Sequence, residues 1–180
     1  MTRRDLLAAV CGATLGGLPL AAAPQPANGL RDQDGRRFSL AALRGREVAL
    51  FFGYTHCPDV CPTVLATLAL VQRRLGANAR LAVVFVTVDP ARDDAARVRR
   101  FVRTFDPRFI GVTGDAAALE PLYRAYGVWS AKIPNPDGVG YLLAHESEIV
   151  LLDAGGTPRA RRPWNVPTAD LTRDVRALLP

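Results

Sequence analysis

The stretch Val48-Ala-Leu-Phe-Phe-Gly-Tyr-Thr-His-Cys-Pro-Asp-Val-Cys-Pro-Thr63 contains the feature that decides the fold. Its apolar beginning predicts a buried β-strand over 48–53, and the spacing of apolar residues from Val64 onward predicts a helix. Cys57 and Cys61 therefore lie in a turn that joins a strand to a helix. Four residues make about one helical turn, so a helix that begins near Cys57 places both side chains on one face.

This turn favours thiol chemistry. Unpaired N–H groups and the positive end of the helix dipole stabilise a thiolate at the start of a helix. Two neighbouring thiolates suit a soft metal such as Cu(I), and the same pair can close to a disulfide. Pro58 and Pro62 follow the two cysteines within the turn, which disfavours the simpler interpretation of two unrelated core cysteines.

The rest of the chain alternates predicted strands and helices, which is typical of an α/β domain. Strands are expected over 47–53, 80–88, 109–113, 148–153 and 157–161, and helices over 64–75, 94–105, 115–127 and 168–179. Asp93 or Asp94 is expected to cap the second of these helices, Asp115 to start the third and Thr168 to cap the last. A hairpin over 30–38 precedes them as an N-terminal extension. Prolines and glycines between Ser130 and Ala144 predict an inserted loop that forms neither helix nor strand and is mobile without metal.

The first 23 residues predict an export signal. Thr2-Arg3-Arg4 followed by an apolar segment resembles a twin-arginine signal, and Ala21–Ala23 is a suitable cleavage site. An uncleaved membrane anchor is the alternative. Residues 24–29 are then a linker and 30–180 the domain. Cys11 falls within the signal, so an exported protein keeps only the two motif cysteines, for chemistry rather than as a disulfide framework.

The composition excludes several function classes. The formal net charge is +6, and arginines cluster within 97–103 and 159–162. No nucleic-acid motif or interleaved aromatic residue accompanies them, so a solvated face is the simpler interpretation, and contact with an acidic protein remains open. The sequence also lacks a glycine-rich phosphate loop and a serine nucleophile elbow.

The cysteine motif resembles a known family. Tyr54-Thr-His-Cys-Pro-Asp-Val-Cys-Pro62 is similar to the signature of the Sco/SenC proteins, thioredoxin-like copper-binding proteins required to build the dinuclear copper centre of cytochrome c oxidase. The likeness continues through Val86-Thr-Val-Asp-Pro-Ala-Arg-Asp93 and reaches His145, so it covers most of 28–180. It implies a thioredoxin-like fold and one copper ion per chain, as Cu(I), Cu(II) or both.

A third ligand is needed to hold Cu(II) as well as Cu(I), and imidazole suits both. The chain has two histidines, His56 and His145. The residues alone leave His145 as either a ligand or an ordinary structural histidine. The resemblance implies that it binds copper together with Cys57 and Cys61, and that His56 only forms hydrogen bonds within the turn.

The resemblance also bears on two neighbouring positions. Asp89 ends a predicted strand at the sheet edge where ligand sites gather, and the likeness implies a role behind the copper ligands or facing a partner. An acidic turn residue before Pro90 is the simpler alternative. Ala144 stands where the family usually has an aspartate, which can orient the histidine ring, and Glu146 is the candidate substitute.

The resemblance implies an assembly factor rather than a turnover enzyme. Such a protein delivers copper to the copper-site subunit of cytochrome c oxidase, or reduces the cysteines of that subunit. We expect a monomer in the periplasm, or anchored facing it, with other copper chaperones as further partners and no nucleic acid. The alternative is a thiol–disulfide oxidoreductase or thioredoxin-like peroxidase that uses Cys57 and Cys61, although reductases usually carry C-x2-C.

Overall fold

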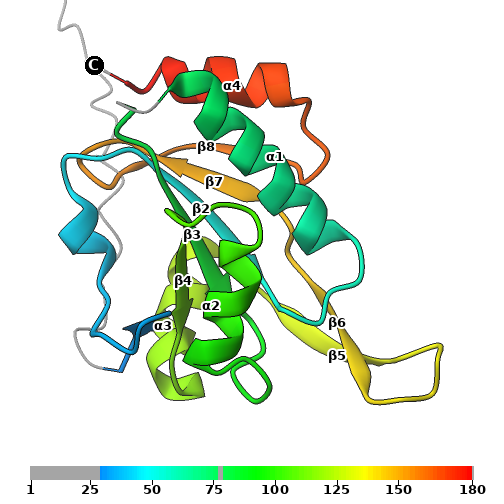
Figure 1. Cartoon of the computed structure of the whole chain (residues 1–180). Helices are drawn as coiled ribbons and strands as arrows, with labels where there is room; N and C mark the ends of the chain where they lie inside the picture. The colour runs from blue at the N-terminus through cyan, green and yellow to red at the C-terminus, as the bar shows by residue number, and fades with distance from the viewer. Residues whose placement is uncertain (1–28, 77–78, 180) are drawn as a thin grey trace, which may run out of the picture.

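The computed structural model describes residues 29–76 and 79–179, so the predicted export signal and nearly all of the linker lie outside the described residues. A six-stranded sheet runs through the domain in the order β1-β4-β3-β2-β7-β8 (Figure 1). Its strands are β1 (Arg31–Asp32), β2 (Val48–Gly53), β3 (Ala82–Thr87), β4 (Ile110–Thr113), β7 (Ile149–Leu152) and β8 (Pro158–Arg162). The three central strands β2, β3 and β4 are parallel, and the others pair antiparallel. The expected mixed sheet is therefore confirmed.

Helices cover both faces of this sheet, which is why β2 and β3 are buried along their whole length. The helices are α1 (Val60–Leu75), α2 (Ala95–Arg103), α3 (Ala116–Tyr126) and α4 (Thr168–Arg176). Phe85 contacts Phe101 of α2, whereas Phe52, on the opposite face, contacts Tyr126 of α3. Helices α1 and α4 lie side by side (Figure 1). The arrangement is that of a thioredoxin-like fold.

The helix caps follow the sequence at two of three predicted positions. The side chains of Asp94 and Asp115 accept hydrogen bonds from the first turns of α2 and α3, as expected. The predicted cap at Thr168 is wrong, because Pro167 occupies the cap position and Thr168 is already the first residue of α4. Within 29–76 and 79–179, no helix is long and apolar enough to cross a membrane.

The segment before His145 is a β-hairpin, so the prediction that it forms neither helix nor strand is wrong. Strand β5 (Ser130–Pro134) pairs antiparallel with β6 (Tyr141–His145), as Figure 1 shows. The turn-forming residues are concentrated between the two strands, where Gly138 donates its N–H to the carbonyl of Asn135 at 2.9 Å. Because Pro136, Gly138 and Gly140 lie in the turn, the residues on either side are free to pair.

Candidate metal centre

The two cysteines lie where β2 ends and α1 begins. Cys57 is half-buried in the turn, and Cys61, the second residue of α1, is completely buried. The helix begins at Val60 rather than near Cys57. Even so, the backbone N–H of Cys61 donates to the sulfur of Cys57 at 3.4 Å. The first helical turn therefore holds the Cys57 sulfur against the end of the helix.

The two thiols differ strongly in acidity. The hydrogen bond from the Cys61 thiol lowers the pKa of Cys57 to about 4, and the N–H groups of Cys61 and Asp59 add to this effect against the opposing effect of burial. The pKa of Cys61 is raised, first because its proton is shared with Cys57 and then because burial disfavours a second charge. The side chain of Asp59, at the N-cap position of α1, makes no capping hydrogen bond. The sulfur of Cys57 instead accepts an N–H group of the first helical turn. At neutral pH the reduced pair holds one thiolate and one thiol.

His145, the last residue of β6, directs one ring nitrogen at these sulfurs. Its Nε2 lies 3.8 Å from the Sγ of Cys61, although the two residues are 84 positions apart in the chain. Its Nδ1 lies 2.6 Å from the backbone carbonyl of Glu146. A carbonyl can only accept, so Nδ1 carries the proton and the lone pair of Nε2 faces Cys61.

The same contact explains how the ring is oriented without an aspartate at position 144. The carboxylate of Glu146 accepts the N–H of Ser147 at 3.1 Å and is therefore engaged elsewhere. The backbone carbonyl of Glu146, rather than its side chain, is the acceptor for the histidine ring. The ring of Tyr54 also packs edge-on against His145, with 5.6 Å between ring centres.

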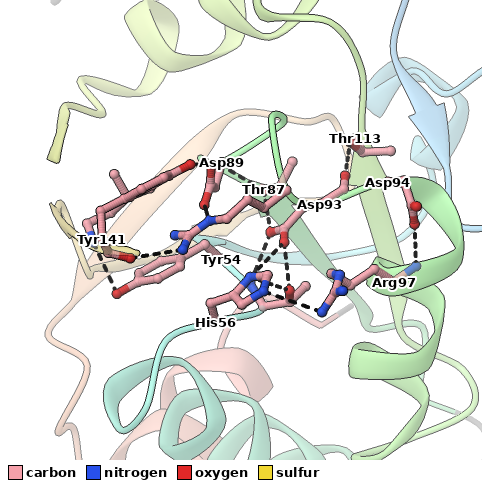
Figure 2. Close-up of polar contacts among 12 residues, drawn as sticks. Tyr54, His56, Thr87, Asp89, Asp93, Asp94, Arg97, Thr113 and Tyr141 are labelled. Atoms are coloured by element: carbon pink, nitrogen blue, oxygen red, sulfur yellow. Dashed lines mark hydrogen bonds and ion pairs between the residues drawn. The ribbon is translucent and has the colours of Figure 1, made fainter. Parts of the chain in front are cut away.

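His56 contacts Asp93 and Arg97 rather than the sulfurs (Figure 2). Its Nδ1 lies 3.4 Å from Thr55 Oγ1 and 3.7 Å from Asp93, and its Nε2 lies 3.4 Å from a guanidinium nitrogen of Arg97. The buried carboxylate of Asp93 also accepts from both the N–H and the hydroxyl of Thr55, and from the hydroxyl of Thr87. Asp93 thus ties the residues just before Cys57 to β3.

Asp89 is buried, with 3 % of its surface exposed. Its two oxygens accept from the hydroxyl of Tyr141, at 2.7 Å, and from the guanidinium of Arg92. Tyr141 begins the strand that ends at His145. Asp89 therefore touches the element that carries the predicted ligand. The pairing of Tyr141 with Asp89 has no local signal, because the two residues are 52 positions apart in the chain.

An open groove gives access to Cys57 and His145. Its wall includes Trp129, Ile133 and Leu142 from the segment that forms the hairpin, together with Pro58. Trp129 and Ile133 are exposed, by 54 % and 41 %. A half-buried thiol and an imidazole thus open onto a partly apolar surface.

Comparison with known proteins decides the family. The family model described as SCO1/SenC matches residues 22–180. The chain belongs to the SCO1/SenC family. It is 41 % identical over 130 residues to "Protein SCO2 homolog, mitochondrial" of Bos taurus, a match that covers 71 % of this chain and 49 % of that protein. The chain spans about half the length of the curated relatives it matches.

Solved Sco structures resemble this chain over most of its length. ScoI of Bradyrhizobium japonicum with copper bound gives a TM-score of 0.76 at 34 % identity, and covers 84 % of this chain and 96 % of that one. ScoI of Arabidopsis thaliana with copper bound gives a TM-score of 0.76 at 32 % identity, over 82 % of this chain and 92 % of that one. The thioredoxin-like fold is thereby confirmed.

The Sco-family site offers a donor set that suits a soft metal. With bonds of about 2.3 Å to sulfur and about 2.0 Å to nitrogen, as for zinc, one ion spans the 3.8 Å between Cys61 Sγ and His145 Nε2 at an angle of roughly 120°. Within the described part of the chain, no group of three or more His, Cys, Asp or Glu residues already meets the spacing of a closed metal site. A shift of at least one of the three candidate ligands is therefore needed to complete the set.

Proposed function

We propose that this chain binds one copper ion through Cys57, Cys61 and His145 and acts as an assembly factor for the copper centre of cytochrome c oxidase. The observation that carries the proposal is the lone pair of His145 Nε2 directed at Cys61. Thiol–disulfide exchange needs no imidazole there, whereas a metal that must be held as Cu(II) does. Copper-bound relatives of the same fold support the choice of metal.

Each of the three proposed ligands contributes differently to copper binding. The Cys57 thiolate supplies a negatively charged sulfur ligand. Cys61 loses its proton when a metal binds, because metal ligands must be deprotonated. The imidazole extends binding from Cu(I) to Cu(II). The groove beside Cys57 and His145 gives the recipient's own ligands a route to the metal. Copper is the cargo of such a protein, and the oxidase subunit with the copper site is its recipient.

A second candidate function is supported by the unequal thiols. The Cys57 thiolate would attack a disulfide of the oxidase subunit, forming a mixed disulfide and releasing one thiolate of that subunit. Cys61, after losing its proton, would then attack the Cys57 sulfur, closing the Cys57–Cys61 disulfide and releasing the second thiolate. The half-buried position of Cys57 and its low pKa favour it as the attacking group.

Copper titration of the fully reduced protein tests the proposal. We expect one equivalent of Cu(II) to give a thiolate-to-copper absorption band. Cys57→Ala or Cys61→Ala should abolish tight binding, and His145→Ala should weaken Cu(II) far more than Cu(I), because two thiolates can hold Cu(I) in linear geometry. His56→Ala is the matched control and should leave stoichiometry unchanged. Unaltered Cu(II) binding in His145→Ala would overturn the three-ligand site and favour the oxidoreductase.

The proposal includes export to the periplasmic side of the membrane, either cleaved or anchored. It rests on Arg3 and Arg4 ahead of an apolar segment that ends in small residues. An exported location also fits a protein whose cysteines beyond that segment are only Cys57 and Cys61. Mass spectrometry of the N-terminus of the exported protein distinguishes cleavage after Ala23 from an intact anchor.

A further inference from the structure

The hairpin that carries His145 depends on contacts with the rest of the domain. Among the strands of the described residues, β5 and β6 pair only with each other, and every residue of β5 is exposed. An isolated two-stranded hairpin is marginally stable at best in water. The place of His145 beside Cys61 is therefore set by whatever fixes β6 to the sheet.

Three side chains fix the beginning of β6. The hydroxyl of Tyr141 donates to Asp89 Oδ1 at 2.7 Å, and a guanidinium nitrogen of Arg92 donates to the backbone carbonyl of Tyr141 at 2.9 Å. The Nε of Arg92 donates to the other oxygen of Asp89, which closes the ring of contacts (Figure 2). We refer to Asp89, Arg92 and Tyr141 as the clamp. It joins the loop after β3 to the hairpin.

Stacking adds to these hydrogen bonds. The guanidinium carbon of Arg92 lies 3.6 Å from the centre of the Tyr141 ring and 5.9 Å from that of Tyr54. Arginine suits such a place because its planar group stacks on a ring while its edge donates hydrogen bonds. One further guanidinium nitrogen of Arg92 is buried without a hydrogen-bond partner. The side chain keeps this orientation despite that cost, so its other contacts determine it.

A second attachment lies between the clamp and His145. The hydroxyl of the buried Tyr54 accepts the N–H of Leu143 at 3.2 Å, and its ring packs against the ring of His145. The strand is thus held at its first residue by the clamp and at its third and fifth residues by Tyr54. Tyr54 itself lies directly after β2, close to the cysteines. Loosening the clamp removes the attachment farthest from the thiols and lets the strand pivot about Tyr54.

We propose that Arg92 and Tyr141 are positioning residues for the third copper ligand: with Asp89 they hold the hairpin so that His145 Nε2 stays beside the Cys61 sulfur. This inference rests on the proposed function. It also makes a selective prediction. The clamp should affect Cu(II), which needs the imidazole, and should leave Cu(I), which two thiolates can hold, nearly unchanged.

Two variants test the clamp. Tyr141→Phe removes the hydroxyl but keeps the ring, and Arg92→Gln removes both the stacking and the charge. We expect each to weaken Cu(II) binding by about 10-fold or more, the effect typical of residues that orient a metal ligand. Cu(I) affinity, measured by competition with a chelator, should change by less than about 3-fold. Arg162→Gln, which breaks an ion pair with Asp174 elsewhere in the domain, is the matched control.

A double-mutant cycle separates positioning from general stability. In a His145→Ala background, Tyr141→Phe should have no further effect on Cu(II), because the ligand it positions is gone. A full additional loss in that background would overturn the inference. So would Tyr141→Phe and Arg92→Gln variants that both bind Cu(II) like the wild type.

Hydrogen exchange of the copper-free protein gives an independent readout. Tyr141→Phe should speed hydrogen exchange of the amides in β6 and leave exchange of the amides in α1 unchanged. If the β6 amides exchange at the same rate in the variant and the wild type, the clamp does not hold the hairpin. Failure of the proposed function is distinguishable. In that case the wild-type protein shows no Cu(II) binding that depends on His145, while the exchange experiment still decides whether the clamp holds the hairpin.

Discussion

Gly53, the last residue of β2, is the position where one added methyl group tests the packing of the site. A Cβ built on it would lie 2.8 Å from the sulfur of Cys61, 2.9 Å from a ring carbon of Phe85 and 3.0 Å from one of Phe51. Ordinary contact begins at 3.4 Å, so the sulfur would have to move by at least about 0.6 Å, the difference between these distances. All three neighbours are completely buried and cannot swing into solvent.

Gly53→Ala should therefore destabilise the protein and disturb the thiols together. Overpacking of this kind costs about 1–3 kcal/mol. At roughly 2–4 °C per kcal/mol for a domain of this size, the melting temperature should fall by about 2–12 °C. Copper affinity should also fall, because the substitution displaces the Cys61 sulfur from its place 3.8 Å from His145 Nε2, where one ion can contact both atoms. Thermal unfolding of the copper-free protein and copper competition measure the two effects separately.

Two other glycines provide the controls. Gly111→Ala would place a Cβ 2.3 Å from Val98 and near no cysteine atom, so it should lower stability and leave copper affinity unchanged. Gly155→Ala, in an exposed turn where only a side-chain oxygen of Asp153 is near, should change neither. The reasoning fails if Gly53→Ala melts like the wild type, or if it alters copper binding no more than Gly111→Ala does.

Three further predictions concern acidity, the buried carboxylate and the hairpin. Because the pKa of Cys57 is lowered to about 4, its alkylation in the reduced protein should stay fast down to about pH 5 and slow only as the pH falls through 4, which mass spectrometry can follow at each pH. The same shift should make the reduced protein more stable as the pH rises from 4 toward 9, because in this range Cys57 is protonated in the unfolded state and ionised in the folded state. Chemical denaturation at several pH values measures the effect, and a free energy of unfolding that stays constant from pH 4 to 9 would contradict the assignment. Asp93→Ala removes the acceptor of three hydrogen bonds from two threonines and should cost at least about 2 kcal/mol in the free energy of unfolding, whereas Asp94→Ala, which removes only a helix cap, should cost about 1 kcal/mol. In the copper-free protein, amides of the β5–β6 ladder should be protected from exchange while those of residues 135–140 are not, and rapid exchange throughout would restore the mobile-loop interpretation.

The sequence by itself determined the parts of the molecule that depend on neighbours in the chain. Apolar runs located β2 and β3, and aspartates located the starts of α2 and α3. The cysteine pair was evident for the same reason, since both thiols lie within one turn of backbone. Preferences for strand, helix or cap that depend on nearby residues can be predicted from residue composition and spacing.

The hairpin shows where such reasoning fails. Its composition is rich in turn residues, and all of these except Pro134 lie between the two strands, so an average over the segment hides two short strands. The alternation of Ala131 and Ile133 with Ser130 and Lys132 is too short to mark β5, which ends in a proline and is exposed along its whole length. Its pairing with β6 is stabilised by contacts outside the segment, which a local pattern does not report.

Tertiary structure alone decided what surrounds the thiols. It brings His145 to Cys61 across 84 positions and joins Tyr141 to Asp89 across 52. It also replaces the expected aspartate beside the histidine with a backbone carbonyl, which has no side-chain signature in any sequence. These contacts form because folding places the β5–β6 hairpin beside the segments that follow β2 and β3. The free energy that holds them comes from burial and hydrogen bonding that neither segment has on its own.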